Sequence, residues 1–329
     1  MIRFAVIGTN IITREFLDAA AQYPDEIKVT AICSRTMERA KALQADYPDI
    51  GLLFDDIAAL AACDEVDAVY IGTTNYVHYP QAMAMLRSRK HVLVEKPAGS
   101  NYHEVASMVD YANQMGLVWM EAIRDVYMPG YEVIKNNLHK LGDIRRFTAI
   151  YCKYSSRYDA FKSGTYLNAF IPDLSNSALM DLGVYCVHPI VKLFGRPTSV
   201  NCSGIRMHNG FEGMGTLILN YPDKQGVVMF SKINNSHSPA EIQGELGCML
   251  MPHVTSMDHL IIRYNDGSVE ELPMDEHKNG MYYQVGTFIK AVKGEYDLKD
   301  AYKASLDEAW VMETARRQTG VRFPADEIY

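Results

Sequence analysis

The chain has 329 residues, of which 48% are hydrophobic and 22% are charged, and its formal net charge is −8 at pH 7. This composition is typical of a globular, soluble protein, and the length favours two domains. The negative charge argues against a nucleic-acid surface, which needs clustered lysine and arginine. No apolar run approaches the roughly 18 residues of a membrane span, so we expect neither nucleic acid nor membrane as a partner.

The cysteines and histidines show no spacing typical of a disulfide framework or a metal site. The six cysteines are scattered without a CxxC pair, at positions Cys33, Cys63, Cys152, Cys186, Cys202 and Cys248. They predict reduced thiols in a cytoplasmic protein. The chain opens directly on strand-like residues rather than on the basic and apolar segments of a signal peptide. We therefore expect a cytoplasmic protein without a bound metal.

The first third of the chain alternates short apolar runs with segments of helical period. The strands are predicted at 2–7, 28–33, 52–54, 68–71, 91–94 and 117–120, and helices between them include 36–47, 77–89 and 101–115. Near-continuous apolar runs suit strands that are buried on both faces. The alternation predicts βαβ units and a parallel, doubly wound α/β sheet over residues 1–122, with ligands bound beyond the carboxyl ends of the strands.

After residue 122 the pattern changes to one dominated by strands. Strand runs are predicted near 145–154, 199–206, 213–221 and 226–233, and an Asp-Gly turn in the 259–273 segment predicts a hairpin. Helices are predicted at 131–141, in the segment SALMDLGVYCVHPIVKLF, and twice near the carboxyl terminus. Residues 123–329 therefore predict an α+β domain built on a large, mostly antiparallel open sheet.

The stretch AVIGTNIITREF, residues 5–16, runs from an apolar strand through a glycine into an amphipathic helix. A dinucleotide fingerprint requires G-x-G-x-x-G at this place. Only Gly8 is present, and Asn10 and Thr13 stand where the other two glycines belong. Taken by itself, the stretch fits an ordinary strand-to-helix turn as well as a cofactor loop.

Residues 72–101, GTTNYVHYPQAMAMLRSRKHVLVEKPAGSN, closely resemble the Gfo/Idh/MocA family of NAD(P)-dependent oxidoreductases, nearest its dimeric dihydrodiol dehydrogenase and glucose–fructose oxidoreductase branch. Three more segments agree with the family: EAIRDVYMPGYEVIKNNLHKLGDI, ALMDLGVYCVHPI and GVRFPAD. The resemblance implies a Rossmann domain followed by a domain for substrate binding and dimerisation. It also implies hydride transfer between nicotinamide and a carbinol or carbonyl carbon of a sugar, polyol or cyclic diol.

With this resemblance, the loops after the strands are expected to bind the cofactor, and the Asn10 amide could donate to a phosphate. The second strand ends in Ser34-Arg35-Thr36 without an acid before Glu38. A guanidinium attracts a 2′-phosphate, so NADP is predicted over NAD; the alternative is that Arg35 is a solvated charge. The expected cofactor-binding residues are Gly8, Thr9, Asn10, Ile11, Ile12, Ser34, Arg35, Thr36, Thr73, Asn75, His78, Glu95, Lys96 and Pro97, with the Pro97 peptide bond often cis in the family.

The family pattern D-x-G-x-H-x-x-D appears in ALMDLGVYCVHPI with tyrosine for the first histidine and histidine for the last acid. Asp181, Tyr185 and His188 are spaced i, i+4 and i+7, on one face of a helix, and Gly183 could allow close approach of the cofactor or of another backbone. Because a nearby ammonium lowers the pKa of a phenol, Tyr185 is the predicted acid/base, with Lys96 as its partner and Asp181 in support.

Several alternatives stay open at this point. Lys96 itself could transfer the proton, and Tyr185 and His188 could be ordinary core residues. A relative that keeps its cofactor bound could catalyse epimerisation or elimination, and a non-catalytic NADP-binding sensor would not need both Lys96 and Tyr185. By resemblance we expect a homodimer, formed through the open sheet. The expected substrate contacts are Arg124, His188, Tyr158 and Tyr166.

Overall fold

The computed structural model describes residues 1–274 and 279–328, and the chain divides into two compact units. The first unit comprises Met1–Arg124 together with the segment from residue 279 to Tyr302. The second comprises Asp125 to residue 274 together with Lys303 to residue 328. The sequence placed everything after residue 122 in one domain, so the return of residues 279–302 to the first unit is a difference from that expectation.

The first unit contains a six-stranded parallel sheet in the order β3-β2-β1-β4-β5-β6. The predicted doubly wound parallel sheet is therefore confirmed. The strand order reverses between β1 and its neighbour β4, and ligands of such sheets bind beyond the strand ends at this point. The strands are β1 (Ile2–Ile7), β2 (Ile27–Cys33), β3 (Leu52–Phe54), β4 (Ala68–Ile71), β5 (His91–Glu95) and β6 (Trp119–Ala122).

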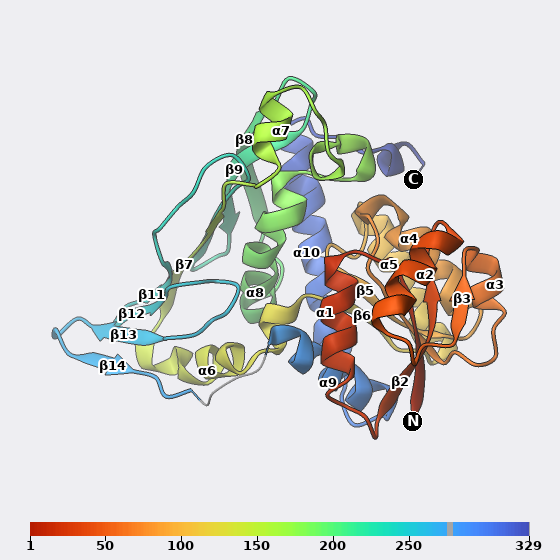
Figure 1. Cartoon of the computed structure of the whole chain (residues 1–329). Helices are drawn as coiled ribbons and strands as arrows, with labels where there is room; N and C mark the ends of the chain where they lie inside the picture. Colours follow the sequence, from red (N-terminus) through yellow and green to blue (C-terminus); the bar gives the residue numbers. More distant parts are fainter. Residues whose placement is uncertain (275–278, 329) are drawn as a thin grey trace. The chain divides into compact units, whose positions relative to one another are not determined.

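Helices flank this sheet, and one of them comes from the far end of the chain (Figure 1). Helix α9 packs on α1, and the Phe288 ring in α9 lies 5.4 Å from the Phe4 ring in β1. Helix α5 begins after Asn101, whose side chain accepts the Glu104 N–H as the helix cap. The helices are α1 (Ile11–Ala20), α2 (Met37–Asp46), α3 (Ile57–Ala61), η1 (Asn75–Val77), α4 (His78–Arg87), α5 (Tyr102–Met115) and α9 (Gly280–Val292).

The second unit contains an eight-stranded sheet in the order β14-β13-β12-β11-β7-β10-β9-β8. Among the described strand pairs of this second sheet, only β7–β10 is parallel, which confirms a mostly antiparallel sheet. The Asp-Gly turn joins β13 to β14 as predicted, whereas β11 and β12 were not predicted. The strands are β7 (Ile144–Cys152), β8 (Ser199–Arg206), β9 (Glu212–Asn220), β10 (Gln225–Ser231), β11 (Ala240–Gly244), β12 (Gly247–Met251), β13 (Ile261–Tyr264) and β14 (Val269–Glu271).

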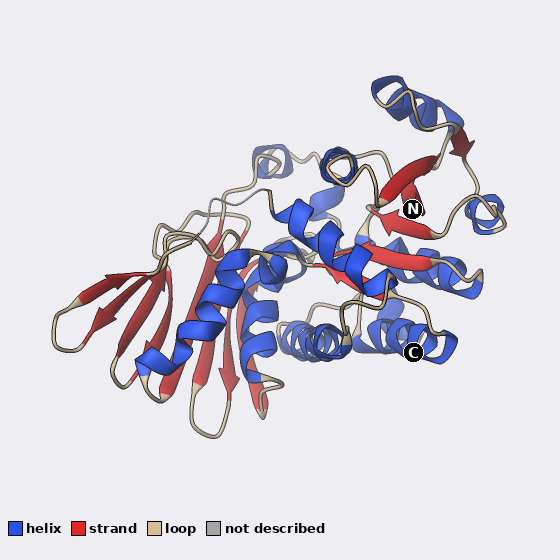
Figure 2. Ribbon diagram, turned by 90° about the horizontal axis from the view of Figure 1, so that it is seen from below, coloured by secondary structure: helices blue, strands red, loops and turns tan. Residues whose placement is uncertain are grey.

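Helices α6 and α8 lie against one face of this sheet, and no helix of the described residues covers the other (Figures 1 and 2). Val228 and Phe230 are buried on the helix side, whereas Met229 between them is 38% exposed. The helical segments of this unit are η2 (Arg124–Tyr127), α6 (Pro129–Asn137), η3 (Leu138–Leu141), α7 (Tyr158–Lys162), η4 (Asn168–Phe170), η5 (Pro172–Leu174), η6 (Leu179–Gly183), α8 (Val184–Phe194), α10 (Lys299–Gln318) and η7 (Pro324–Glu327), of which η2 and α10 begin in the first unit.

One segment meets the length and hydropathy of a membrane span, although none was expected from the sequence. Pro172–Phe194 passes by length and composition, but 72% of its apolar window is buried within the protein. Such burial is typical of a core helix.

Candidate active site

In the first unit, Gly8 links the loop after β1 to the loop after β4. Its φ of +111° is one that other residues rarely adopt, and a Cβ added here would lie 2.5 Å from the Gly72 carbonyl oxygen. The Asn10 amide nitrogen donates to that same oxygen at 2.8 Å, while its Oδ1 accepts the Thr13 N–H at 3.2 Å as the cap of α1. The amide therefore joins the two loops with one N–H, and because Asn10 is exposed and its amide has a second N–H, its contact with a phosphate stays a prediction.

Thr13 stands in place of the third glycine of the fingerprint and is completely buried. A Cβ added to Gly72 would lie 2.9 Å from the Thr13 hydroxyl oxygen. In the usual fingerprint, the third glycine leaves room between the helix and the sheet. Here Gly72, directly after β4, leaves that room for the Thr13 side chain of α1. This exchange keeps the helix close to the sheet although two of the three glycines are missing.

The first turn of α1 presents the remaining residues expected at the phosphates. Ile11 is 75% exposed, and Thr9 and Ile12 are partly exposed. The amino end of a helix offers N–H groups and a positive dipole end to an anion. The cofactor contacts of Thr9, Ile11 and Ile12 stay predictions.

The loop after β2 holds Ser34, Arg35 and Thr36. Ser34 is buried, and its N–H donates to the Phe54 carbonyl of β3 at 3.0 Å. Thr36 caps α2 by accepting the Arg39 N–H at 3.4 Å. Arg35 and Arg39 are both exposed, so two guanidinium groups flank the start of this helix. Arg39 was not predicted, although its spacing of four residues from Arg35 within a helix start was a usable signal.

His78 lies behind the loop after β4 rather than on its surface. The ring is completely buried, with Nδ1 at 2.9 Å from the Pro97 carbonyl oxygen and Nε2 at 3.2 Å from that of Thr73. Burial lowers the pKa of His78 to about 4, so the ring is neutral and can donate to only one of these oxygens. The His78 ring therefore joins the loops after β4 and β5. The cofactor contact expected of this residue stays a prediction.

Two other predicted residues lie in this loop. The Thr73 hydroxyl donates to Gln81 Oε1 at 2.7 Å, and Asn75 begins η1 as a partly exposed residue. Their cofactor contacts stay predictions.

The loop after β5 joins a buried acid to a partly exposed lysine. Glu95 accepts the Tyr70 hydroxyl at 2.8 Å, and burial raises the pKa of Glu95 to about 7 against the opposing effect of the Lys96 ammonium. Lys96 is partly exposed, and its bond to Pro97 is cis, as the resemblance implied. Because Glu95 is buried and bonded to Tyr70, its carboxyl supports the loop, and its expected cofactor contact stays a prediction.

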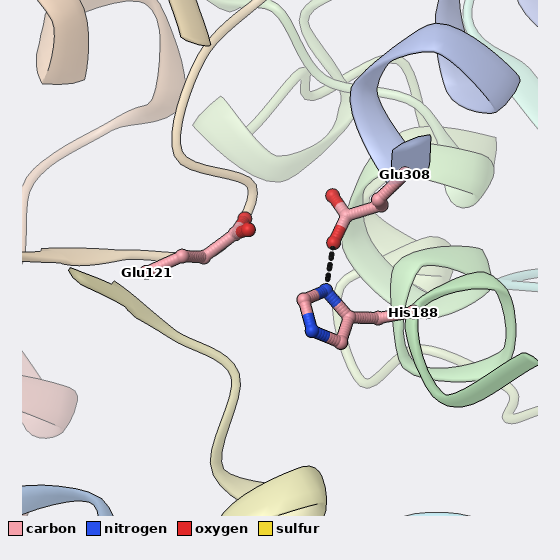
Figure 3. A group of neighbouring side chains, drawn as sticks. All are labelled: Glu121, His188 and Glu308. Carbon is pink, nitrogen blue, oxygen red and sulfur yellow. Dashed lines mark hydrogen bonds and ion pairs between the residues drawn. The ribbon is translucent and has the colours of Figure 1, made fainter. Parts of the chain in front are cut away.

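The end of β6 contributes Glu121 and Arg124. The Glu121 carboxylate (drawn in Figure 3) is buried and accepts the Ala98 N–H at 2.8 Å, so it holds the segment after Pro97. Arg124 lies 3.5 Å from the Glu15 carboxylate of α1. Its predicted substrate contact stays a prediction. The sequence did not predict a role for Glu121, because an acid within an apolar run gives no indication of which residue it contacts.

In the second unit, Asp181 lies in a π-helical turn, η6, that leads into α8. Such wide turns are often found at functional sites. A Cβ on Gly183 would lie 2.7 Å from Leu179 Cδ1 and 3.3 Å from the Phe230 ring of β10. Gly183 therefore allows the turn to pack on a strand of its own unit, which corrects the expectation that it makes room for a cofactor or backbone.

The Asp181 carboxylate is paired with a lysine that the sequence did not reveal. Lys232 Nζ donates to Asp181 Oδ2 at 2.6 Å and to the Ala169 carbonyl oxygen at 3.2 Å. Lys232 is 4% exposed. Asp181 was predicted to support Tyr185 and Lys96; within its own unit, it is paired with Lys232. The two residues are 51 positions apart, so no local pattern could have joined them.

Tyr185 follows the π-turn at the start of α8. Its ring is partly exposed and lies edge-on to Tyr151 of β7, with 5.8 Å between the ring centroids. The contact fixes the ring, and the acid/base role of Tyr185 stays a prediction.

The two tyrosines proposed for the substrate belong to an aromatic cluster around α7. Tyr158 stacks on Phe161 and Phe170 at centroid distances of 6.1 and 5.9 Å. Tyr166 is 45% exposed, and its hydroxyl lies 2.7 Å from His208 Nε2. Their substrate contacts stay predictions.

His188 is buried, and Figure 3 shows its ring directed at Glu308 of α10. Nδ1 lies 2.5 Å from the Glu308 carboxylate. Burial lowers the pKa of His188 well below its ordinary value, so a neutral ring donates from Nδ1 to this acid. The bond joins α8 to α10. The expected substrate contact of His188 stays a prediction.

Comparison with known proteins agrees with the two-unit architecture. Residues 2–122 match a family described as an oxidoreductase family with an NAD-binding Rossmann fold, and residues 137–250 match the GFO/IDH/MocA C-terminal domain.

The relatives cover the chain almost completely. It is 45% identical over 330 residues to scyllo-inositol 2-dehydrogenase (NADP(+)) of Bacillus subtilis (strain 168), covering 99% of this chain and 100% of the relative. It is 28% identical over 343 residues to trans-1,2-dihydrobenzene-1,2-diol dehydrogenase of Macaca fuscata fuscata, covering 99% of each. A 3-ketoreductase from Actinomadura kijaniata, solved with NADP, shares the fold with a TM-score of 0.84 at 24% identity, covering 98% of each chain.

Proposed function

The chain belongs to the Gfo/Idh/MocA family of oxidoreductases, as its sequence motifs predicted, and on that premise we propose that it is an NADP-dependent dehydrogenase of cyclic polyols or diols. The observation that carries the proposal is the 45% identity, over essentially the full length of both chains, to an NADP(+)-dependent scyllo-inositol 2-dehydrogenase. The lower identity to the diol dehydrogenase supports the same class of secondary alcohol. The reaction converts a ring CH–OH to a ketone, or the reverse.

The first unit has the groups that NADP requires. Because Gly8 has no Cβ, the loop after β1 can lie against the Gly72 backbone of the loop after β4. A glycine at this place also allows the tight turn that brings a pyrophosphate to the start of α1. Arg35 and Arg39 are exposed at the start of α2, where an NAD site usually has an acid. Two guanidinium groups suit the bidentate recognition of a 2′-phosphate. When bound, the nicotinamide supplies the hydride acceptor or donor.

For the proton, we propose that the Tyr185 phenolate accepts it from the carbinol hydroxyl, and that the resulting phenol returns it in the reductive direction. The Lys96 ammonium would favour the phenolate and orient the substrate oxygen. Asp181 would support this arrangement from the π-turn one turn before Tyr185. Direct proton transfer by Lys96 is the alternative assignment.

We also propose a cytoplasmic homodimer. All six cysteines are free thiols, which suits a reducing compartment. The face of the eight-stranded sheet without helices carries exposed apolar side chains, among them Ile205, Ile218 and Met229 on β8, β9 and β10. An apolar sheet face of this kind suits burial against a second copy. Light scattering of the purified protein is the check, and the 37.1 kDa mass of a single chain would contradict the dimer.

The enzymatic proposal is tested by measuring NADPH formation from scyllo-inositol, myo-inositol, aldoses and cyclic diols, with NAD in parallel. We expect activity on at least one cyclic polyol or diol, with a clear preference for NADP. Tight NADPH binding without turnover on the whole panel would favour a sensor. Isomerised or dehydrated product without net NADPH would favour an epimerase or eliminase.

A further inference from the structure

Lys232 is a buried cation whose ammonium is held from several sides within the second unit. Besides its bonds to Asp181 and the Ala169 carbonyl, Nζ lies 5.1 Å from the centroid of the Phe170 ring and 5.8 Å from that of Phe211. Both rings are completely buried. Cations are attracted to the faces of aromatic rings, and more so where water is excluded. The ammonium therefore has a fixed place.

The backbone of Lys232 is fixed as well. Its N–H donates to the Gly213 carbonyl of β9 at 2.9 Å, and its carbonyl accepts the Ser155 N–H at 2.9 Å. Because both backbone groups and the ammonium are held, the side chain has little freedom to leave Asp181. A buried charge is costly to retain without a partner, so the pair with Asp181 is needed for Lys232 to remain charged at this place.

The Asp181 side of the pair is different. The Asp181 side chain is 39% exposed, against 5% for that of Lys232. The carboxylate thus extends from a buried anchor towards solvent, on the turn before Tyr185. The same strand end supports the turn twice, since Phe230 of β10 packs on Gly183 and Lys232 follows β10 directly.

We propose that Lys232 is a positioning residue, which holds the Asp181 carboxylate in its charged form and in one rotamer for the acid–base reaction. This inference rests on the role given to Asp181 in the proposed function. The inference goes beyond the proposed function, because it assigns Lys232, a residue of the second unit, as the anchor of the Asp181 carboxylate.

The test compares Lys232→Met with a matched control at the other end of the same strand. Lys224 directly precedes β10, pairs with Asp223 at 2.7 Å and lies 5.6 Å from the Phe194 ring centroid. Both substitutions thus remove an ion pair with an aspartate and a contact with an aromatic ring. With scyllo-inositol and NADP+, Lys232→Met should lower kcat about tenfold to a hundredfold, a part of the roughly hundredfold to ten-thousandfold that acid–base help supplies. Lys224→Met should change kcat less than about twofold.

A positioning role also predicts which constants stay unchanged. The Kd for NADPH and the KM for NADP+ should remain close to wild type in Lys232→Met, and Lys232→Arg, which keeps the charge, should recover part of kcat. If Lys232 had only a structural role, Lys232→Met would lower the melting temperature but leave the kcat of the folded protein unchanged. Normal kcat in Lys232→Met, with kcat reduced in Asp181→Asn, would overturn this inference and leave the proposed function standing. Normal kcat in Asp181→Asn would overturn this inference together with the role given to Asp181, while the dehydrogenase activity itself would stand.

The double variant Asp181→Asn/Lys232→Met decides the case even if Lys232→Met does not fold. It has no unpaired buried charge, so it avoids the main cost of the single change. If Lys232 acts through Asp181, the double variant should have the kcat of Asp181→Asn within about twofold. A further loss of more than about tenfold would show an independent role and overturn the inference.

Discussion

Replacing Glu95 with glutamine should remove a pH dependence from the stability of the first unit. Glu95 is buried at the end of β5, and its carboxyl accepts the Tyr70 hydroxyl at 2.8 Å. Burial raises the pKa of Glu95 from 4.5 to about 7. Glutamine has nearly the same shape and can accept the same hydroxyl, but it has no proton to lose.

The sign follows from proton binding. Between pH 4.5 and 7 the native Glu95 keeps a proton that the unfolded chain has released, so raising the pH favours unfolding. Each unit of difference between the unfolded and the native pKa of Glu95 is worth about 1.36 kcal/mol, so the difference between 4.5 and about 7 corresponds to about 3 kcal/mol of unfolding free energy. The wild type loses none of this unfolding free energy below pH 4.5 and has lost all of it above pH 7. Relative to the wild type, the glutamine variant should therefore gain about 3 kcal/mol of unfolding free energy between pH 4.5 and 8.

The assay is urea unfolding at pH 5, 6, 7 and 8 in a Trp310→Phe background, where the fluorescence reports Trp119 in β6 of the first unit. Glu65→Gln, at an exposed acid of the same unit, is the control and should keep the parental slope. Tyr70→Phe removes a hydroxyl that lowers the pKa of Glu95, so the loss of stability should continue above pH 7. If Glu95→Gln kept the parental pH slope, the reasoning from burial would be refuted.

Three further predictions concern the cofactor and the chemistry. Gly8→Ala should lower the unfolding free energy by about 2 kcal/mol or more, measured by urea unfolding, because the new Cβ would meet the Gly72 carbonyl oxygen from a strained φ; a stable variant would contradict this. Arg35→Ser should raise the KM for NADPH at least about tenfold while changing that for NADH little, because one charged hydrogen-bonding group is lost; equal effects on both cofactors would count against a 2′-phosphate contact. Tyr185→Phe and Lys96→Met should each lower kcat at least about a hundredfold with nearly unchanged NADPH affinity, and near-normal turnover of Tyr185→Phe would reduce that tyrosine to a packing role.

The sheet of the first unit was predictable because its strands β1, β4, β5 and β6 are buried on both faces. Such strands appear as unbroken apolar runs, and the predicted and observed bounds agree within two residues for all six. In the second unit, β11 and β12 were missed, since each is five residues long and glycines flank the turn between them. Short strands of this kind depend on their neighbours in the sheet more than on their own sequence.

For the site, the sequence indicated the strand ends of the first unit, but it could not show which other residues the side chains there contact. Asn10, His78 and Glu95 all lie at or near the carboxyl ends of strands, and each bonds a neighbouring loop or strand. Their orientation depends on partners 19 to 62 residues away, such as Gly72 for Asn10. The pairing of Lys232 with Asp181 is equally distant in sequence. Only tertiary structure could reveal these contacts.

The return of α9 to the first unit has a consequence for the order in which the protein folds during synthesis. Stacked rings of Tyr23 and Tyr282, 4.6 Å apart, and an ion pair of Glu26 with Lys293 tie this helix to the end of α1. At about 5–20 residues per second, the ribosome needs on the order of ten to thirty seconds between completing β6 and completing α9. During that interval the α1 surface that later contacts α9 is without its native cover. Neither unit can be obtained by cutting the chain once, and a fragment ending near Arg124 should aggregate unless α9 is supplied.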